Sequence, residues 1–474
     1  MKIALINPPN KKEQYYDSSH SFSHLGLGYV AASLESSGYE VDYYETYLQG
    51  ISQKEIIEIL IKNEYCAIGF TAYYYNIFEI IRMASKIKKY FNPFIFVGGI
   101  YASTNCNDIL INSCIDCCVL GEGEVTVINL MESLRKKNDW RDIMGIAYSA
   151  PNGIIASKRG CVDILDNLPF PQRPYILKNK IVSMIASRGC NGNCSFCGIR
   201  SYYSEFTTTN IRIRSTKNVV EEIKHLVKNQ NIDYIYFQDE NFFSIFNIDV
   251  TWAHRFCELI LRENLEFKFY LYARADDIVN HESILKELKK SGLQCVFVGI
   301  ESFIDRQLKL FNKRTTREIN LQALQILKEN SFNFIIGFIP LDPFITMEEL
   351  FENISTLLSS KFYENSFFGQ TPISCLSPLF PMPMTNIYKL LNEKKLYKPE
   401  ILHKYIFQDT KIQSFYEELE SWRNGIRKEY EIIDNRYKNT DYISIENQKL
   451  LEELRNLLKK DIEFLYDLCY SRAR

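Results

Sequence analysis

Three cysteines in one short segment form the arrangement in this chain that is best suited to chemistry. Cys190, Cys194 and Cys197 follow the spacing C-x3-C-x2-C, and the aromatic Phe196 precedes the third of them. Three thiolates so close in sequence can ligate three irons of a [4Fe-4S] cubane, which leaves its fourth iron without a protein ligand. Such an open iron can bind a substrate, as the open position of a catalytic zinc does. The segment therefore predicts an iron–sulfur cluster with one iron available for chemistry.

A structural zinc site is the alternative explanation for these cysteines. Zinc sites usually take two pairs of ligands, and the next histidine, His225, already falls in a helical pattern. A second group of cysteines lies upstream, where Cys117 and Cys118 occupy an apolar stretch typical of a buried strand. Adjacent strand residues point to opposite faces, so these two are expected to be buried thiols rather than ligands of a second cluster.

The bulk composition is that of an ordinary globular protein. The chain has 474 residues, of which 46% are hydrophobic and 24% charged, enough for two or three domains. A net charge of −2 argues against general affinity for nucleic acid, and no apolar run reaches membrane-spanning length. The apolar stretch near Met1 is too short for a signal peptide. The 13 scattered cysteines, an odd number, fit reduced thiols and predict a cytoplasmic location.

Residues 1–138 alternate strand and helix patterns, which predicts a Rossmann-like, doubly wound parallel sheet. Strands are expected over 2–7, 39–44, 66–71, 94–97 and 116–120, with helices over 26–37, 53–63, 76–90 and 125–135. Ligands bind such sheets at the carboxyl ends of the strands, where glycines let the backbone come close. These ends carry Pro8, Thr71, Ala72, Gly98, Gly99, Gly121, Glu122 and Gly123. Any one glycine pair would also fit a simple tight turn, but four such ends favour a ligand-binding sheet.

A second strand–helix series occupies residues 181–375 and predicts a partial (β/α)6 barrel of the TIM type. Its strands are expected over 181–186, 233–237, 267–272, 294–298, 333–338 and 368–374. Residues 139–180, between the two domains, predict a linker with a hairpin at 143–157. Residues 376–474 predict a helical C-terminal region.

Charged and polar residues follow the strands of this barrel, where barrel enzymes place their chemistry, and the cysteines follow the first strand. Asp239 and Glu240 follow the second strand, and an acid there can hold an ammonium group. Arg274 follows the third strand, and its guanidinium can grip a carboxylate. Glu301 and Ser302, after the fourth, can accept and donate hydrogen bonds. Solvated loop residues are the alternative for each of these positions.

The C-x3-C-x-aromatic-C spacing resembles the signature of the radical S-adenosylmethionine (SAM) superfamily. The resemblance implies that SAM chelates the open iron and that one electron from the reduced cluster cleaves SAM to a 5'-deoxyadenosyl radical. It places an aromatic residue near the adenine, acids at the amino group and an arginine at the carboxylate of SAM. The SAM-contacting residues that it implies are Phe196, Asp239, Glu240, Arg274, Glu301 and Ser302. After the fifth strand, residues 341–343 depart from the apolar, glycine-rich turn usual in the family.

An N-terminal sheet joined to such a barrel is similar to the cobalamin-binding subgroup of this superfamily, over roughly residues 1–410. The segments that carry this resemblance are 26–32, 97–99, 121–124 and 168–171. It implies that the strand ends of the first domain bind cobalamin. Cobalamin would then carry a methyl group from SAM to an unactivated carbon of a small-molecule or peptide substrate. An electron donor such as flavodoxin or ferredoxin is also implied.

Many cobalamin domains supply a lower axial histidine from a D-x-H-x-x-G motif, which this sequence lacks. His20 and His24 lie in the corresponding loop without that pattern. A histidine in a loop more often caps a helix or forms local hydrogen bonds, so neither is predicted to ligate cobalt.

Two other functions stay open at the level of the sequence. One is a radical reaction without methyl transfer, such as a rearrangement, cyclisation, epimerisation or oxidation. Cys295 or Cys375 would be candidates to return a hydrogen atom there, and a core thiol is the alternative for both. The other is a sensor that binds cobalamin or a cluster without turnover and signals through residues 411–474. Neither the substrate nor the oligomeric state follows from the sequence.

Overall fold

The computed structural model describes residues 1–9, 22–111, 113–204, 207, 211–361, 364, 378–401, 404–422, 432 and 445–473. The chain divides into two compact units. Residues 1–177 form most of the first unit, which also includes the later segment 202–218. Most of the remaining chain forms the second unit.

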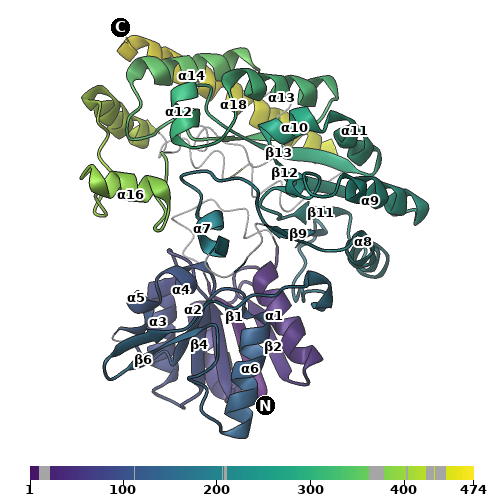
Figure 1. Cartoon of the computed structure of the whole chain (residues 1–474), viewed down its shortest axis with the longest axis vertical. Helices are drawn as coiled ribbons and strands as arrows, with labels where there is room; N and C mark the ends of the chain where they lie inside the picture. Colours follow the sequence, from purple (N-terminus) through teal and green to yellow (C-terminus); the bar gives the residue numbers. More distant parts are fainter. Residues whose placement is uncertain are drawn as a thin grey trace. The chain divides into compact units, whose positions relative to one another are not determined.

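The first unit is built on a seven-stranded sheet with the order β2-β1-β3-β4-β5-β6-β7 (Figure 1). Its five parallel strands are β1 (Lys2–Asn7), β2 (Glu40–Glu45), β3 (Ala67–Thr71), β4 (Phe94–Gly98) and β5 (Cys117–Val119). The remaining two, β6 (Ile146–Ala150) and β7 (Gly153–Ala156), are antiparallel. These two form the hairpin expected at 143–157, which extends the edge of the sheet.

Two apolar cores cover the two faces of this sheet, as a doubly wound sheet requires. The helices of the unit are α1 (Leu25–Ser36), α2 (Gln53–Asn63), α3 (Ile77–Ile87), α4 (Ile100–Thr104), α5 (Cys106–Leu110) and α6 (Gly123–Lys136). One core joins Phe70 of β3 to Leu60 of α2 and Ile80 of α3. The other contains Leu34 of α1 and Leu130 of α6. The doubly wound fold predicted from the alternating pattern is confirmed.

The adjacent cysteines of β5 point to opposite faces of the sheet. Cys118 belongs to the core on the α2–α3 face and Cys117 to the core on the α1–α6 face. Both are fully buried, and burial raises the pKa of each thiol well above its ordinary value. The prediction of two buried thiols on opposite faces is therefore confirmed.

The second sheet has the order β14-β13-β12-β11-β8, and its strands from β11 to β14 are parallel. They are β8 (Ile181–Met184), β11 (Tyr234–Phe237), β12 (Lys268–Arg274), β13 (Leu293–Glu301) and β14 (Asn333–Phe338). The expected sixth strand, at 368–374, lies outside the described residues. The short strands β9 (Ser187–Gly189) and β10 (Ile211–Ile213) lie on either side of the cysteines in the chain.

Helices connect these strands in the βα order that the sequence predicts. They are α7 (Gly198–Ser204), α8 (Thr216–Lys224), α9 (Val250–Arg262), α10 (Ala275–Asn280), α11 (Glu282–Lys290), α12 (Asp305–Leu310), α13 (Arg317–Glu329) and α14 (Met347–Ser359). Two later helices are α16 (Asn386–Glu393) and α18 (Ile445–Ala473). The long α18 lies beside α14 (Figure 1). Phe351 of α14 contacts the rings of Tyr466 and Tyr470 of α18.

Two strands of the second sheet run further than the sequence pattern predicts. Strand β12 ends at Arg274 and β13 at Glu301, so both residues are the last of a strand rather than the first of a loop. In β13 the register with β14 shifts between Gly299 and Glu301, and Glu301 has a φ of 62°. This bulge allows β13 to remain paired with β14 up to its last residue. It also changes the direction of the Glu301 side chain from the one that regular strand alternation would give.

Candidate active site and cofactor sites

The cysteine loop connects β9 to α7, and the sulfurs of Cys190 and Cys194 both lie close to Gly192. The backbone N–H of Gly192 donates to Cys190 Sγ at 3.2 Å. A Cβ at Gly192 would lie 3.3 Å from Cys190 Sγ and 3.9 Å from Cys194 Sγ, so a side chain there would fill the space between the two sulfurs. Glycine at this position therefore leaves a cradle in front of two of the three predicted iron ligands.

A single segment at the end of α12 holds the loop in place. Ser195 donates from its backbone N–H to Phe311 O at 2.8 Å and from its hydroxyl to Leu310 O at 2.6 Å. Asn312 donates from its side chain to Asn193 O at 2.7 Å. The loop conformation thus depends on residues more than 100 positions away in the chain.

The donors of this loop fit an iron–sulfur cluster. Burial raises the pKa of Cys197 to about 11 and also raises that of Cys190, so both sulfurs are thiols until a metal displaces their protons. Soft thiolates prefer iron–sulfur clusters and zinc among the biological metals, and backbone N–H groups directed at sulfur are usual around clusters. Among the described residues, no group of three or more Cys, His, Asp or Glu side chains is arranged to hold a metal ion, so the fit of this loop rests on the chemistry of its donors.

Arg274 extends from the end of β12 to the cysteine loop. Its Nη1 lies 3.6 Å from Cys194 Sγ, while Nε and Nη2 donate to the two carboxylate oxygens of Asp276 at 2.9 and 3.1 Å. Nη2 also donates to Lys313 O. Burial works against the charge of this guanidinium, but the carboxylate of Asp276 more than offsets it and raises the pKa of Arg274. A fixed positive charge therefore stands beside one of the three cysteines.

Glu301 is paired with a residue that the sequence analysis missed. Lys313 Nζ lies 2.7 Å from Glu301 Oε1, and both side chains are buried. Burial alone would lower the pKa of Lys313. The interactions with Glu301 and then with Cys194 outweigh this effect, so the pKa is raised and the ammonium is retained. A Cβ at Gly299 would lie 2.7 Å from Lys313 Nζ and 2.8 Å from Glu301 Oε1, so a side chain there would displace the pair. No local pattern marks Lys313, because its partners come from other strands.

The two acids after β11 bind the backbone that leads into the cysteine loop. Asp239 is fully buried and accepts from Ala186 N at 3.0 Å and from Ser187 Oγ at 2.5 Å. Glu240 Oε2 accepts from Gly189 N at 3.1 Å. These carboxylates therefore fix the entry to the loop.

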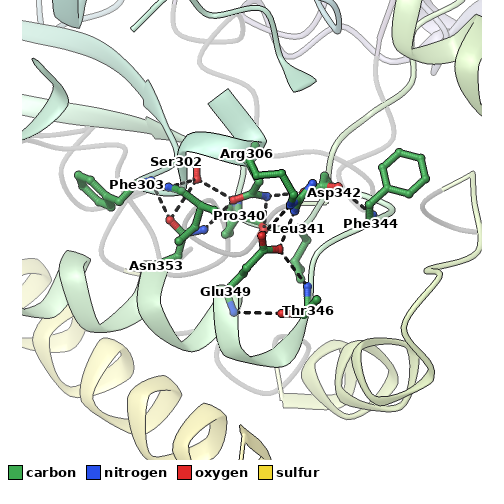
Figure 2. A network of polar contacts seen from close by, with 12 residues as sticks. Ser302, Phe303, Arg306, Pro340, Leu341, Asp342, Phe344, Thr346, Glu349 and Asn353 are labelled. Carbon is green, nitrogen blue, oxygen red and sulfur yellow. Dashed lines mark hydrogen bonds and ion pairs between the residues drawn. The ribbon is translucent and has the colours of Figure 1, made fainter. Parts of the chain in front are cut away.

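Phe196 and Ser302 make contacts of a structural kind. The Phe196 ring packs edge-on against Phe311, with 5.3 Å between the ring centroids. Ser302 is fully buried, and its hydroxyl lies 2.6 Å from Gln307 Oε1 and 3.2 Å from Asn353 Oδ1 (Figure 2). The structure thus brings Arg274 to Cys194 and pairs Glu301 with Lys313, whereas Ser302 belongs to a buried polar network.

The predicted ligand-binding residues of the first unit all lie at one edge of its sheet. They lie at or just after the carboxyl ends of the parallel strands β1, β3, β4 and β5, and they are Pro8, Thr71, Ala72, Gly98, Gly99, Gly121, Glu122 and Gly123. Gly99 has a φ of 95°, and a Cβ there would lie 3.0 Å from Ala72 O and from Thr71 Oγ1. The turn after β4 therefore packs directly on the end of β3, which only glycine permits.

Glu122 forms a buried ion pair within the first unit. Its Oε1 lies 2.6 Å from Arg212 Nη2, and its Oε2 accepts from Arg212 Nη1 at 2.8 Å and from Val162 N at 2.6 Å. Only 5% of the Glu122 side chain and 9% of the Arg212 side chain are exposed. Its carboxylate therefore anchors the turn at Gly121 and Gly123 to the segment 202–218.

His24 caps α1. Its Nδ1 accepts from Leu27 N at 2.9 Å, and its Nε2 lies 2.7 Å from Tyr73 Oη. Burial lowers the pKa of His24 to about 4, so the ring is neutral and its one proton sits on Nε2, facing Tyr73. The expectation of a local capping role holds for His24, whereas His20 lies outside the described residues.

Comparison with known proteins identifies both units. The family model of the radical SAM superfamily matches residues 184–357, and that of the B12 binding domain matches residues 18–131. The chain is 29% identical to the anaerobic magnesium-protoporphyrin IX monomethyl ester cyclase of Rubrivivax gelatinosus over 71% of its own length and 62% of the relative. It is 24% identical to the cytidylyl-2-hydroxyethylphosphonate methyltransferase of Streptomyces wedmorensis, over 82% and 84% of the two chains.

A solved structure with the same fold is that of the cobalamin-dependent SAM radical enzyme OxsB with aqua-cobalamin and SAM bound. The TM-score is 0.80 at 19% identity, over 98% of this chain and 72% of that one. The chain belongs to the radical SAM superfamily and, through its B12-binding domain, to the cobalamin-binding subgroup. The fold class and the cofactors expected from the sequence, a [4Fe-4S] cluster, SAM and cobalamin, are thereby confirmed. Within the described residues, no helix is both long and apolar enough to span a membrane.

The buried pair at Glu122 predicts a large loss of stability when Arg212 is removed. Arg212→Met removes the positive charge opposite the buried Glu122 carboxylate, which should lower the free energy of unfolding of the first unit by about 3 to 5 kcal/mol. Arg135, in an exposed pair with Glu132, is the matched control, and Arg135→Met should leave the free energy of unfolding nearly unchanged. Urea titration followed by hydrogen exchange of β1 and β3 measures both. If the two variants lowered the free energy of unfolding equally, the Glu122–Arg212 pair would not have the structural role given to it here.

The environment of His24 predicts acid sensitivity. Below about pH 6.5 the unfolded chain binds a proton at this ring, whereas the folded protein does so only near pH 4. The free energy of unfolding should therefore fall as the pH drops through this window, by about 2 to 3 kcal/mol from His24 alone. His24→Gln should remove that part of the pH dependence, and the exposed control His225→Gln should not. Urea titrations at pH 7 and pH 4.5 measure this difference for each protein. If His24→Gln kept the full pH dependence of the free energy of unfolding, the role given to His24 would be wrong.

Proposed function

We propose that this protein is a cobalamin-dependent radical SAM methyltransferase that acts on an unactivated carbon of a small-molecule or peptide substrate. The observation that carries the proposal is the cysteine loop with Arg274 and the Glu301–Lys313 pair beside it, in one chain with a B12-binding unit. The chain spans 62% of the cyclase relative but 84% of the phosphonate methyltransferase relative. Because the chain covers more of the methyltransferase than of the cyclase, the comparison supports methyl transfer over the other radical reactions.

Each residue near the cysteines has a place in this proposal. Cys190, Cys194 and Cys197 hold three irons, and the fourth is left for SAM. Arg274 binds the SAM carboxylate, because its guanidinium is fixed beside Cys194 and keeps its charge. Glu240 faces the amino group, and Phe196 lines the adenine. Glu301 contacts the ribose or the amino acid end from its place on the β13 bulge.

The buried members of the predicted set contribute through the backbone that they fix. Asp239 holds the entry of the cysteine loop, and Ser302 holds the exit of β13. In the first unit, the strand ends bind cobalamin, and Glu122 keeps the turn at Gly121 and Gly123 in place through Arg212. When bound, the reduced cluster supplies the electron for SAM cleavage and cobalamin supplies the methyl carrier.

The wider setting of the enzyme is part of the same proposal. A low-potential electron donor such as flavodoxin or ferredoxin reduces the cluster, nucleic acid is not a partner, and the location is the cytoplasm. The free cysteines along the described chain support a reducing compartment. We propose functional limits of 1–138 for the cobalamin domain, 139–180 for the linker, 181–375 for the barrel and 376–474 for the helical region.

A radical reaction without methyl transfer is the second candidate, and the similarity to a named cyclase favours it. It would draw on the same cluster, SAM and cobalamin sites. Cys295, which the sequence offered as a hydrogen donor, is fully buried in β13 with a raised pKa, as a core thiol would be. Cys375 lies outside the described residues. The mass of the product separates the two candidates, since only methyl transfer adds a methyl group in place of hydrogen.

Loss of one loop cysteine should remove both the cluster and SAM cleavage. Cys194→Ser replaces a soft thiolate by a hydroxyl, so the anaerobically reconstituted variant should retain little iron. Its dithionite-driven formation of 5'-deoxyadenosine should fall at least about 100-fold, the loss of a little under 3 kcal/mol of transition-state stabilisation. Iron analysis and mass spectrometry of the nucleoside measure the two quantities.

The exposed Cys66 provides the control for this experiment. Cys66→Ser should hold the same iron as the native chain and cleave SAM at the same rate. A native chain that holds iron and cobalamin but forms no 5'-deoxyadenosine would favour the sensor over an enzyme. If Cys194→Ser cleaved SAM normally, the assignment of the loop would be wrong.

A further inference from the structure

A single buried amide, Gln307 in α12, connects the ends of two neighbouring strands of the second unit. The residue has no exposed surface. Its Oε1 accepts from Ser302 Oγ at 2.6 Å and from Asn353 Nδ2 at 2.7 Å. Its Nε2 donates to Pro340 O at 2.9 Å and to Asp342 Oδ2 at 2.7 Å. Gln307 thus uses both its lone pairs and both its protons, which is the full capacity of a glutamine side chain.

The partners on the Oε1 side fix the exit of β13. Ser302 directly follows the last residue of that strand, and its oxygen also accepts from Ile304 N at 2.9 Å. Asn353 Oδ1 accepts from Phe303 N at 2.8 Å, as Figure 2 shows. The backbone just after Glu301 is therefore held by hydrogen bonds to α12 and α14.

The partners on the Nε2 side fix the turn that leaves β14. Asp342 is fully buried, and its Oδ1 accepts from Phe344 N at 2.8 Å. Burial raises the pKa of Asp342, while Arg306, with Nη2 3.0 Å from Oδ2, opposes that rise. Leu341 O accepts from Tyr405 Oη at 2.9 Å. The turn at 340–342 is therefore held by hydrogen bonds to its own side chains and carbonyl groups. It lies where the chain departs from the usual glycine-rich pattern.

Arg306 extends the network to α14. Its Nε and Nη2 donate to the two oxygens of Glu349 at 2.6 and 2.7 Å (Figure 2). Glu349 also completes a capping box with Thr346 at the start of α14. The turn after β14 is thereby tied to the helix that follows it, and a shift of Gln307 would disturb both strand ends together.

We propose that Gln307 is a positioning residue that sets the spacing between the carboxyl ends of β13 and β14 and so shapes the SAM site. The inference rests on the function proposed above. Ligands of parallel sheets lie at these strand ends, and Glu301, one residue before Ser302, is paired with Lys313 beside Cys194. Ile339 N donates to Glu301 O at 2.8 Å, so the two strand ends already touch through their backbones. Gln307 acts on them without contacting the ligand itself.

The test replaces the amide by a carboxylate of the same shape. Gln307→Glu turns the two donated hydrogen bonds into contacts between oxygens at Pro340 and Asp342, which pushes the strand ends apart. In the reconstituted protein the Kd for SAM and the KM for SAM cleavage should rise at least about tenfold, which equals about 1.4 kcal/mol. The kcat for 5'-deoxyadenosine formation and the iron content should stay within about twofold. Equilibrium dialysis and steady-state assays with dithionite supply these values.

Rescue and control variants separate positioning from a general loss of structure. Adding Asp342→Asn to Gln307→Glu restores a donor opposite the new carboxylate and should recover most of the SAM affinity. Gln325→Glu, on the exposed face of α13, should change neither constant. If Gln307→Glu does not fold, Gln307→Met serves instead, because it keeps the length of the side chain without adding a charge. It should also raise the Kd and the KM for SAM, by a smaller factor.

Two results would overturn the proposal. One is an unchanged Kd and KM in a folded Gln307 variant that retains its iron. The other is a fall in kcat and iron content without a change in SAM affinity, which a merely structural role would produce. A native chain that binds SAM but does not cleave it would instead count against the proposed function, while the Kd values of the variants would still decide the role of Gln307.

Discussion

The buried ion pair between Glu301 and Lys313 is the interaction on which the geometry of the second unit depends. Lys313 follows directly on the residues that hold the cysteine loop, since Leu310 O and Phe311 O accept from Ser195 and Asn312 donates to Asn193 O. Its own carbonyl accepts from Arg274. The segment 310–313 therefore joins the end of β12, the end of β13 and the cysteine loop. Removing either charge would leave the other buried and unpaired, so the pair forces these three parts to keep their arrangement.

Three other buried carboxylates follow the same rule, because each is compensated by donors from a distant part of the chain. Asp239 takes backbone and hydroxyl donors at the entry of the cysteine loop, Asp342 takes Arg306 and Gln307, and Glu122 takes Arg212 and a backbone N–H. A charge placed in a low-dielectric interior costs several kcal/mol unless such donors are present. The turns at strand ends are therefore fixed by side chains, and ligand-binding loops gain rigidity that their glycines alone would not provide.

The sequence was sufficient for those features that depend on local pattern. Alternating apolar segments of helix and strand length predicted both sheets, and the spacing of the cysteines predicted the loop that Gly192 opens. Features that depend on pairing between distant residues were missed. Gln307 lies in the short polar run between the apolar Ile304 and Leu308, no local motif marks Lys313, and the partner of Glu122 is 90 positions away. The predicted end of β13 was three residues early, because pairing with β14 carries the strand through a bulge to Glu301.

The state of His24 explains why a loop histidine near the predicted cobalamin edge is poorly suited to bind cobalt. A histidine ligates metal through an unprotonated nitrogen, and in His24 that nitrogen is Nδ1, which already accepts from Leu27 at the start of α1. To offer Nε2 instead, the ring would have to move its proton to Nδ1. The helix would then lose its cap, at a cost of about 1 kcal/mol, and Tyr73 would lose its hydrogen-bond donor. Local capping chemistry thus competes directly with ligation at this position. The missing D-x-H-x-x-G motif and the tautomer inferred from the Leu27 hydrogen bond therefore agree that His24 serves the fold of α1 rather than the metal.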